Sequence, residues 1–429
     1  MRSRWISRSW FLGVLLALAI PVVSHGQTAR VQGMALQGDY IKDYTAIFTY
    51  PSQVSNVGNL VYGELGRIVP SPGGDVSVDR GVGTVLGNLW DGRYGTWGVH
   101  LREFTPQLGQ GDGTSTPNPG ARGFDPNVNH NEAVDLMWGR KSGTTSFGLR
   151  FNRSFYKSRD VLPGVLTTLE FDSAGAAGRS ANLARNILGF GGGVGFEMNP
   201  NTNVELSLLY ESRTFEDSHP APGPKSHEDK PSTYMVGGRA MWQWQPNVMV
   251  TPVFRWYSFD LSTKTDTTVK DNTLTGWQAG VAGNWTLGTN DLMVLGLTFA
   301  QNRLDEQENL FGIAAPVGTP ALAADLKVTE TIAPQLFAAL ETHVNNWLTF
   351  RMGANKGVSQ KATIEEKAGG RKIEKTLSSF RMNIGAGVKL GTLQLDALVN
   401  NSFPQTLGGF FSQTSDFVSF PKVTATYSF

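Results

Sequence analysis

The sequence predicts an all-β fold: a transmembrane antiparallel β-barrel of about sixteen strands. Three observations predict it. Apolar and polar residues alternate in long runs through most of the chain, and short and long polar links alternate between these runs. The chain also ends in an amphipathic strand with a terminal aromatic residue. All three features are expected of a closed barrel whose apolar outer face meets lipid.

The chain begins with a segment typical of a secretory signal peptide. Three arginines precede an almost unbroken apolar run over 10–23, and the small residues Ser24 and Gly26 then fit a cleavage site after Gly26. A membrane anchor is the alternative, but the run is short for a spanning helix. We therefore expect residues 1–26 to be removed during export to the outer membrane of a Gram-negative bacterium.

The composition argues against several classes of protein. Cleavage would remove three arginines, so the balance of 37 basic and 36 acidic residues would become 34 against 36. A near-neutral chain of this kind argues against a nucleic-acid partner. The absence of cysteine excludes disulfides and thiolate metal sites. Beyond the signal segment no apolar run is long enough for a transmembrane helix. We expect no cofactor and no bound metal.

The alternation is clearest between Phe380 and Leu390. The even positions of this run are apolar, whereas the odd positions are Arg, Asn, Gly, Gly and Lys. One face of such a strand is apolar and the other is polar or nearly without side chains. Similar runs of about ten to fourteen residues recur along the chain, long enough to cross a bilayer. Strands of soluble sandwiches are shorter, at about five or six residues.

The links between these runs alternate in length, which favours a membrane barrel over a soluble sandwich. Short links fall at 91–93, 142–143, 200–201, 246–247, 289–291, 345–346 and 391–392. Long polar links fall at 67–81, 105–130, 157–185, 216–231, 262–273, 305–328, 359–376 and 403–416. We expect the short links to be periplasmic turns and the long links to be extracellular loops. Fourteen strands is the alternative if the segments 82–90 and 131–141 are misassigned.

The final run of the chain is amphipathic and ends in an aromatic residue. Val423, Ala425, Tyr427 and Phe429 share one face of the final run, and polar residues occupy the other. This pattern resembles the C-terminal recognition strand of bacterial outer-membrane proteins, which ends in an aromatic residue. The resemblance implies that the barrel assembly machinery reads Tyr427 and Phe429 and inserts the chain.

Charged residues on the polar faces are candidates to line the lumen, because Arg or Lys facing mid-bilayer lipid costs about 2–4 kcal/mol. They are Arg102, Asp135, Arg150, Glu205, Glu211, Arg213, Arg239, Arg255, Glu341, Arg351, Arg381, Lys389 and Asp396. Trp242, Trp244, Trp256, Trp277, Trp285, Phe350 and Tyr427 should face outer-membrane lipid instead. The inward charges either create a field that orients polar solutes or pair with one another and stiffen the wall.

A stripe of glycines marks one strand. Gly189, Gly191, Gly193 and Gly195 fall on the inward face of residues 186–198. The segment lacks the strand-to-helix context and the Lys-Ser/Thr pair of a phosphate loop. A stripe without side chains admits close approach of another backbone. An inserted loop or the N-terminal segment could pack there, or the stripe could simply ease strand curvature.

Residues 27–56 precede the barrel, which we place at 57–429. The stretches Arg30–Tyr40 and Tyr44–Val54 resemble the N-terminal signature of the long-chain fatty-acid transporter (FadL) superfamily and its PorV-like relatives. In that family an Asn-Pro-Ala element precedes the first strand; here the element is Tyr-Pro-Ser, in which only Pro51 matches. The resemblance implies fourteen strands, a hatch folded into the lumen and uptake of hydrophobic compounds. A periplasmic extension that caps the barrel floor is the alternative.

The sequence shows no sign of catalysis, so we predict that the protein is not an enzyme. A membrane hydrolase needs a Ser–His pair oriented by a third polar group, and no local spacing indicates one. A metal site around His219 and His227 is less favoured than a solvated loop. The leading expectation is a porin-like channel for small polar or ionic solutes. FadL-like uptake through a plugged barrel, and a non-transporting anchor or partner in a secretion or envelope complex, are the alternatives. Homo-oligomerisation stays open.

Overall fold

The computed structural model describes most of the barrel wall and the segment that precedes it. The described residues are 29–66, 68–71, 74–77, 81–87, 89–102, 133–159, 182–218, 226–227, 232–260, 262–265, 269–288, 290–306, 325–367, 370–399 and 422–429. The predicted signal segment, its cleavage site and most of the long links lie outside them.

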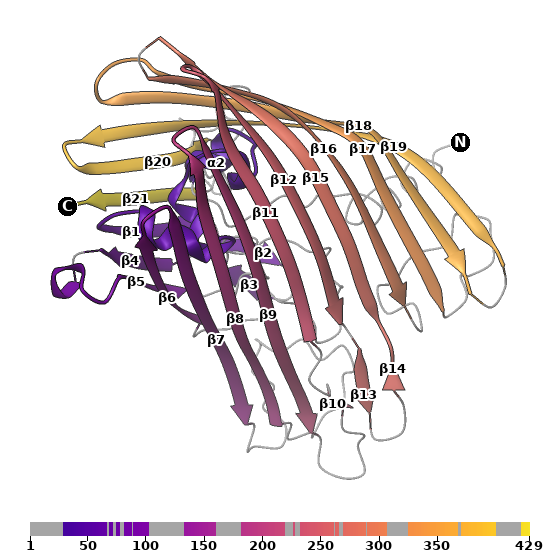
Figure 1. Ribbon diagram of the computed structural model, residues 1–429. Coiled ribbons are helices and arrows are strands. Elements are labelled where there is room, and N and C mark those ends of the chain that lie inside the picture. Colours follow the sequence, from indigo (N-terminus) through magenta and orange to yellow (C-terminus); the bar gives the residue numbers. More distant parts are fainter. Residues whose placement is uncertain are drawn as a thin grey trace, which may run out of the picture.

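Sixteen antiparallel strands among these residues form a closed ring (Figure 1). In ring order they are β1 (Leu60–Gly66), β4 (Gly81–Leu86), β5 (Thr96–Arg102), β6 (Ala133–Ser142), β7 (Thr145–Arg159), β8 (Asn182–Asn199), β9 (Thr202–Ser218), β11 (Ser232–Gln245), β12 (Val248–Asp260), β15 (Thr273–Leu287), β16 (Asp291–Glu306), β17 (Leu326–His343), β18 (Leu348–Glu366), β19 (Lys372–Leu390), β20 (Leu393–Val399) and β21 (Lys422–Ser428). β21 pairs with β1, from Leu60 opposite Ser428 to Gly66 opposite Lys422. The predicted barrel of about sixteen strands is confirmed, and the alternative of fourteen is wrong.

Tight turns join neighbouring strands at one rim of the barrel, the rim at which β1 begins and β21 ends. β6 turns into β7 at Gly143, and β19 turns into β20 at Gly391. These glycines have φ angles of 58° and 64°, a left-handed conformation that residues with a Cβ rarely adopt. The backbone N–H of Phe429 donates to the Asn59 carbonyl at 3.3 Å. Both ends of the wall therefore lie at the rim of the short turns, as an even strand number requires.

The predicted long links contain more strand than expected. β2 (Ile68–Ser71) and β3 (Gly74–Ser77) form a separate hairpin, while β10 (Ser226–His227), β13 (Thr263–Thr265) and β14 (Val269–Lys270) extend the main sheet. The link predicted at 359–376 is wrong, because β18 and β19 stay paired as far as Glu365 and Lys372. The charges that suggest a loop there form ion pairs, including Lys361–Glu374 at 3.0 Å.

The outer face of the wall is apolar and the inner face is polar over much of its height. Trp242, Trp244, Trp256, Trp277, Phe350 and Tyr427 are exposed on the outer face. Trp285 is half-buried, and its ring lies over Gly283. Such a surface suits the hydrocarbon of a bilayer. None of the described helices is long and apolar enough to cross a membrane.

Candidate functional site

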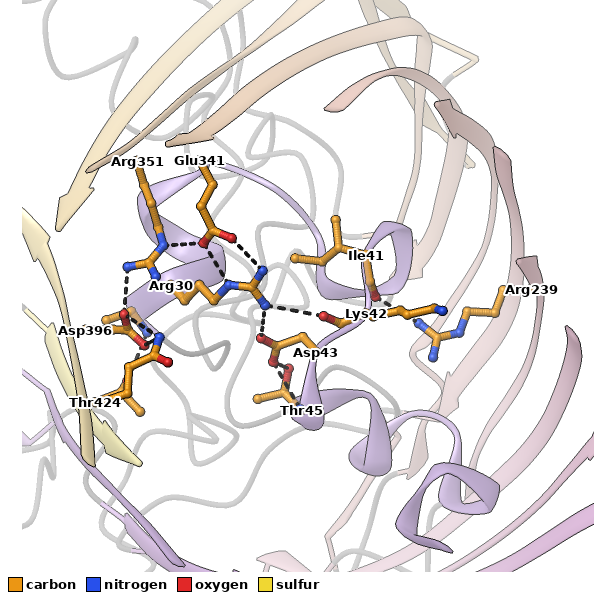
Figure 2. Close-up of polar contacts among 12 residues, drawn as sticks. Arg30, Ile41, Lys42, Asp43, Thr45, Arg239, Glu341, Arg351, Asp396 and Thr424 are labelled. Atoms are coloured by element: carbon orange, nitrogen blue, oxygen red, sulfur yellow. Dashed lines mark hydrogen bonds and ion pairs between the residues drawn. The ribbon is translucent and has the colours of Figure 1, made fainter. Parts of the chain in front are cut away.

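Residues 29–56 lie inside the ring of strands and are called the plug below (Figures 1 and 2). The plug consists of α2 (Ala29–Gly33) and three 3-10 helices: η1 (Gly38–Tyr40), η2 (Tyr44–Phe48) and η3 (Pro51–Asn56). A further 3-10 turn, η4 (Leu89–Gly92), links β4 to β5. α2 contacts β18 to β21, η1 contacts β12, and η3 contacts β5 to β8. Since these strands are spread around the ring, the plug spans the lumen.

Apolar side chains of the plug pack against the inner wall in two clusters. In the first, Val31, Met34, Leu36, Tyr40 and Ile41 meet Val253, Ala282, Val294, Phe337 and Ala339. In the second, Ile47, Phe48 and Val54 meet Leu60, Tyr62, Val85 and Met137. Removal of this much apolar surface from water stabilises the plug in the lumen.

Wall side chains also form hydrogen bonds with the backbone of the plug, which has little regular secondary structure of its own. Side chains of β7, β11, β15, β18 and β19 donate hydrogen bonds to plug carbonyls. These are Arg150 to Phe48 at 2.9 Å, Arg239 to Asp39 at 3.0 Å, Asn284 to Tyr40 at 3.0 Å, Asn355 to Ala35 at 3.4 Å and Asn383 to Gln32 at 2.7 Å. A buried carbonyl without a partner is costly, so these wall residues fix the path of the plug.

A network of charges holds the start of the plug (Figure 2). The Arg30 guanidinium binds both carboxylate oxygens of Glu341 at 2.8 Å and reaches Asp43 at 3.2 Å. Arg351 pairs with Glu341 at 2.5 Å and with Asp396 at 2.6 Å. Burial alone would lower the pKa of Arg30, but the adjacent carboxylates raise it above its ordinary value. Arg30 therefore remains a cation that links α2 to β17.

A second network holds the middle of the plug. Asp39 forms an ion pair with Arg255 of β12, and Arg239 pairs with Glu205 at 2.5 Å. The Arg239 guanidinium also lies 4.6 Å from the centre of the Tyr50 ring. Burial raises the pKa of the nearby Tyr40 phenol to about 12, so this group stays neutral. Tyr40 hydrogen-bonds Thr298 at 2.9 Å. Paired charges and a neutral phenol thus lie in the lumen here.

Glycines of the wall accommodate the backbone around Pro51. A Cβ at Gly193 would lie 2.9 Å from the Ser52 nitrogen and 3.0 Å from Pro51 Cδ, and one at Gly148 would overlap the Pro51 carbonyl. Cβ atoms at Gly191 and Gly195 would come within 3.6 Å of Pro51 and Ser52 respectively. For Gly191 and Gly195 a side chain of an adjacent strand, Leu209 or Ser146, would lie nearer still; for Gly189 all three nearest atoms belong to Asn152 and Glu211 and none to the plug. Gly148 carried no distinguishing signal in the sequence.

Within the described part of the chain, the other candidate lumen residues differ in their partners and in their exposure. Arg150 pairs with Asp135 at 2.7 Å, and Asn152 donates to Glu211 at 3.1 Å. Arg381 is half-buried and Lys389 is exposed. The side chains of Arg102 and Arg213 lie outside the described part of the chain. Most of the described inward charges thus form ion pairs, which agrees better with a stiffened wall than with a field across an open pore.

Part of the inner wall is apolar, a feature the alternation does not reveal. Leu209, Met235, Tyr257, Phe259, Leu274, Leu304, Leu326, Val328 and Ile364 form one buried cluster, with Ile373 packed against it. We call these residues the inner apolar cluster. They come from β9, β11, β12 and β15 to β19, which lie side by side in the ring. The missed signal was the occurrence of apolar residues on both faces of a strand, as at Leu208 and Leu209.

The inner apolar cluster lies on the long-link side of the plug. Along β12, Val253 packs on the plug, Arg255 pairs with Asp39, and Tyr257 and Phe259 of the cluster follow. The order on β15 is equivalent: Ala282 packs on the plug, and Leu274 lies farther toward the long link. An apolar section of lumen is therefore stacked on a plugged section.

Comparisons with known proteins give similar barrels at low identity. No protein-family model and no curated protein matches the chain. The toluene transporter TbuX of Ralstonia pickettii is 9% identical, over 94% of this chain and 97% of that chain, with a TM-score of 0.35. A FadL homologue of Pseudomonas aeruginosa is 10% identical, over 96% and 99%, with a TM-score of 0.39. BamA of Haemophilus ducreyi lacking POTRA domains 1–3 is 12% identical, over 87% and 70%, with a TM-score of 0.36. Similarities this low carry no information on the function of this chain.

Proposed function

We propose that the protein is an outer-membrane barrel that takes up hydrophobic compounds through a lumen closed by its own N-terminal plug. The observation that carries this proposal is the inner apolar cluster on the long-link side of the plug. A path for ions or sugars gains nothing from an apolar lining, whereas a hydrophobic molecule leaving water gains about 25 cal/mol per Å² of buried apolar surface.

The plug argues against the porin-like channel that the sequence favours. A sixteen-strand barrel is wide enough to contain an aqueous pore, but that pore is open only if nothing fills the lumen. Here the plug contacts widely separated wall strands, and its carbonyls and charges are bound by wall side chains. Free diffusion of polar solutes would require many of these contacts to break together. Uptake of a bound hydrophobic molecule that displaces part of the plug fits the geometry better.

Uptake of naphthalene tests this function. Cells of a Gram-negative host that express the protein should accumulate radiolabelled naphthalene several-fold faster than cells without it. The double variant Met235→Gln/Leu274→Gln makes the inner apolar cluster polar and should abolish most of the gain, whereas the outward Glu374→Gln should not. Uptake equal to that of the empty host, or uptake unaffected by the double variant, would refute the proposal.

We further propose that the chain reaches the membrane through cleavage after Gly26 and insertion by the barrel assembly machinery. Tyr427 and Phe429 support this route because both rings are exposed and stacked, with centroids 6.0 Å apart. They are thus available at the rim on the strand that closes the ring. Mass spectrometry of the mature N-terminus tests the cleavage, since Gln27 should be the first residue.

A further inference from the structure

A carboxylate lies within the inner apolar cluster, and no lysine or arginine in the described part of the chain forms an ion pair with it. Glu330 is on the inner face of β17, next to Val328 and Ile332, and is 8% exposed. Asn302 donates its Nδ2 hydrogen to Glu330 Oε2 at 3.3 Å, and the Tyr257 hydroxyl donates to Asn302 Oδ1. Among the described residues no group donates a hydrogen bond to Glu330 Oε1.

Glu330 differs in this respect from four other buried carboxylates of the lumen. Asp135, Glu205, Glu341 and Asp396 each form an ion pair with an arginine. Within the described part of the chain no ion pair joins Glu330 to a lysine or arginine. Burial of an acceptor without a partner is costly, so an orphaned oxygen in an apolar lining indicates that another molecule supplies the donor.

The surroundings of Glu330 resemble a ligand site in their chemistry. Ligand sites are mostly apolar, with a few polar groups that fix orientation. Leu304, Val328 and Ile364 supply apolar surface on β16, β17 and β18. Gly276 of β15 leaves room for the polar pair, since a Cβ there would lie 2.6 Å from both Asn302 Oδ1 and the Tyr257 ring. Tyr257 and Asn302 thus hold Glu330 Oε2, while Oε1 is buried and receives no hydrogen bond from the described residues.

We propose that Glu330 binds the head group of a hydrophobic amine whose apolar body lies on the inner apolar cluster. An ammonium group carries three N–H donors and no acceptor, which matches a carboxylate oxygen that lacks a donor. A hydroxyl can also donate but brings no opposite charge. A carboxylate ligand would place like charges together in an apolar environment. This assignment rests on the proposed uptake of hydrophobic compounds and defines its substrate class.

Three probes with one aromatic body test the assignment. 1-Naphthylmethylamine, 1-naphthalenemethanol and 1-naphthoate are titrated by calorimetry against the full-length protein in nanodiscs of zwitterionic lipid, and empty nanodiscs are subtracted. Wild type should bind the amine about ten-fold more tightly than the alcohol, as a charge-assisted hydrogen bond predicts, and the naphthoate most weakly. Glu330→Gln should reduce amine affinity about ten-fold and alter alcohol affinity less than about three-fold. The matched Glu374→Gln on the outer face should change neither.

The outcomes separate this inference from the function on which it rests. If naphthalene is taken up but wild type binds the naphthoate as tightly as the amine, the assignment to Glu330 is overturned and hydrophobic uptake stands. The same holds if Glu330→Gln keeps the preference for the amine. If no probe binds and naphthalene is not taken up, the proposed function itself fails. If Glu330→Gln does not fold, the order of the wild-type affinities for the three probes alone tests the assignment to Glu330.

Discussion

Individual buried ion pairs fix the position of the plug on the wall more specifically than its apolar contacts do. Arg351 bridges Glu341 and Asp396, and Glu341 also binds Arg30 of the plug, so these four side chains form one network (Figure 2). The alternation predicted from the sequence identifies Glu341, Arg351 and Asp396 as inward. It could not identify Arg30 as their partner, because no periodic pattern covers the segment that contains it.

Substitution of Arg351 should therefore lower the stability of the barrel. Arg351→Ala leaves Glu341 and Asp396 with one fewer cation in a buried site, and removal of one partner of such a pair costs about 3–5 kcal/mol. Urea unfolding of the barrel in lipid vesicles measures the change. Arg303→Ala is the matched control, because its pair with Asp305 is solvent-exposed and should contribute less than about 1 kcal/mol. Equal losses in the two variants would mean that the network carries no special stability.

Close backbone approach gives a second test at single positions. A Cβ at Gly353 would overlap the Met34 carbonyl of the plug, whereas one at Gly192 would meet nothing within 4 Å. Gly353→Ala should thus destabilise the plugged barrel by about 1–3 kcal/mol and loosen the plug, while Gly192→Ala should be near neutral. Limited proteolysis between residues 29 and 56 measures the loosening. A plug equally protected in both variants would contradict the close packing of Met34 on the wall.

At the level of elements, alternation predicts strands well and the content of the lumen poorly. The period-two pattern gives the strands and their outward aromatics, because each side chain alternates between lipid and interior. It says nothing of what occupies the interior. Pro51 and the glycines of β8 indicate a close approach, yet the contact of Pro51 with Gly148 on β7 depends on pairing between strands that the sequence does not specify. The inner apolar cluster was missed because the sequence does not show which of two adjacent apolar residues faces lipid and which faces the lumen.

Removal of the plug as an element should convert a closed barrel into a conducting one. Because the plug contacts β5 to β8, β12 and β18 to β21, wild type should show negligible steady conductance in a planar bilayer. A variant lacking residues 29–56 should show ohmic conductance that rises with salt. Charge reversal at Arg351 in that variant should shift ion preference toward cations. A barrel that stays closed after the deletion would show that something other than the plug blocks the lumen.

The whole molecule depends on pairing between its first and last strands. β1 and β21 pair along seven registered positions, and inside the lumen Lys422 Nζ lies 3.8 Å from Glu64 Oε2. The N–H and C=O groups of a free strand edge find no hydrogen-bond partners in lipid. Closure pairs these groups within the protein, so it is required in a bilayer. The sequence predicts closure in general from the even number of strands and the terminal aromatic strand. The register of the closing pair depends on the strand tilt around the whole ring, which no local pattern encodes.

Cysteine cross-linking tests this register, because the natural chain contains no cysteine. Gly63 and Ala425 face each other across β1 and β21, so the double variant Gly63→Cys/Ala425→Cys should form a disulfide on mild oxidation. In the control Gly63→Cys/Leu395→Cys, the second cysteine lies one strand farther, since Leu395 of β20 is opposite Ala425. Two strand spacings amount to about 9–10 Å, beyond the reach of a disulfide. The first variant should resist unfolding on a denaturing gel until it is reduced, because its ring is closed covalently. Absence of cross-linking in the test pair would show that the ring closes in a different register, and cross-linking in the control would show that β21 does not lie between β1 and β20.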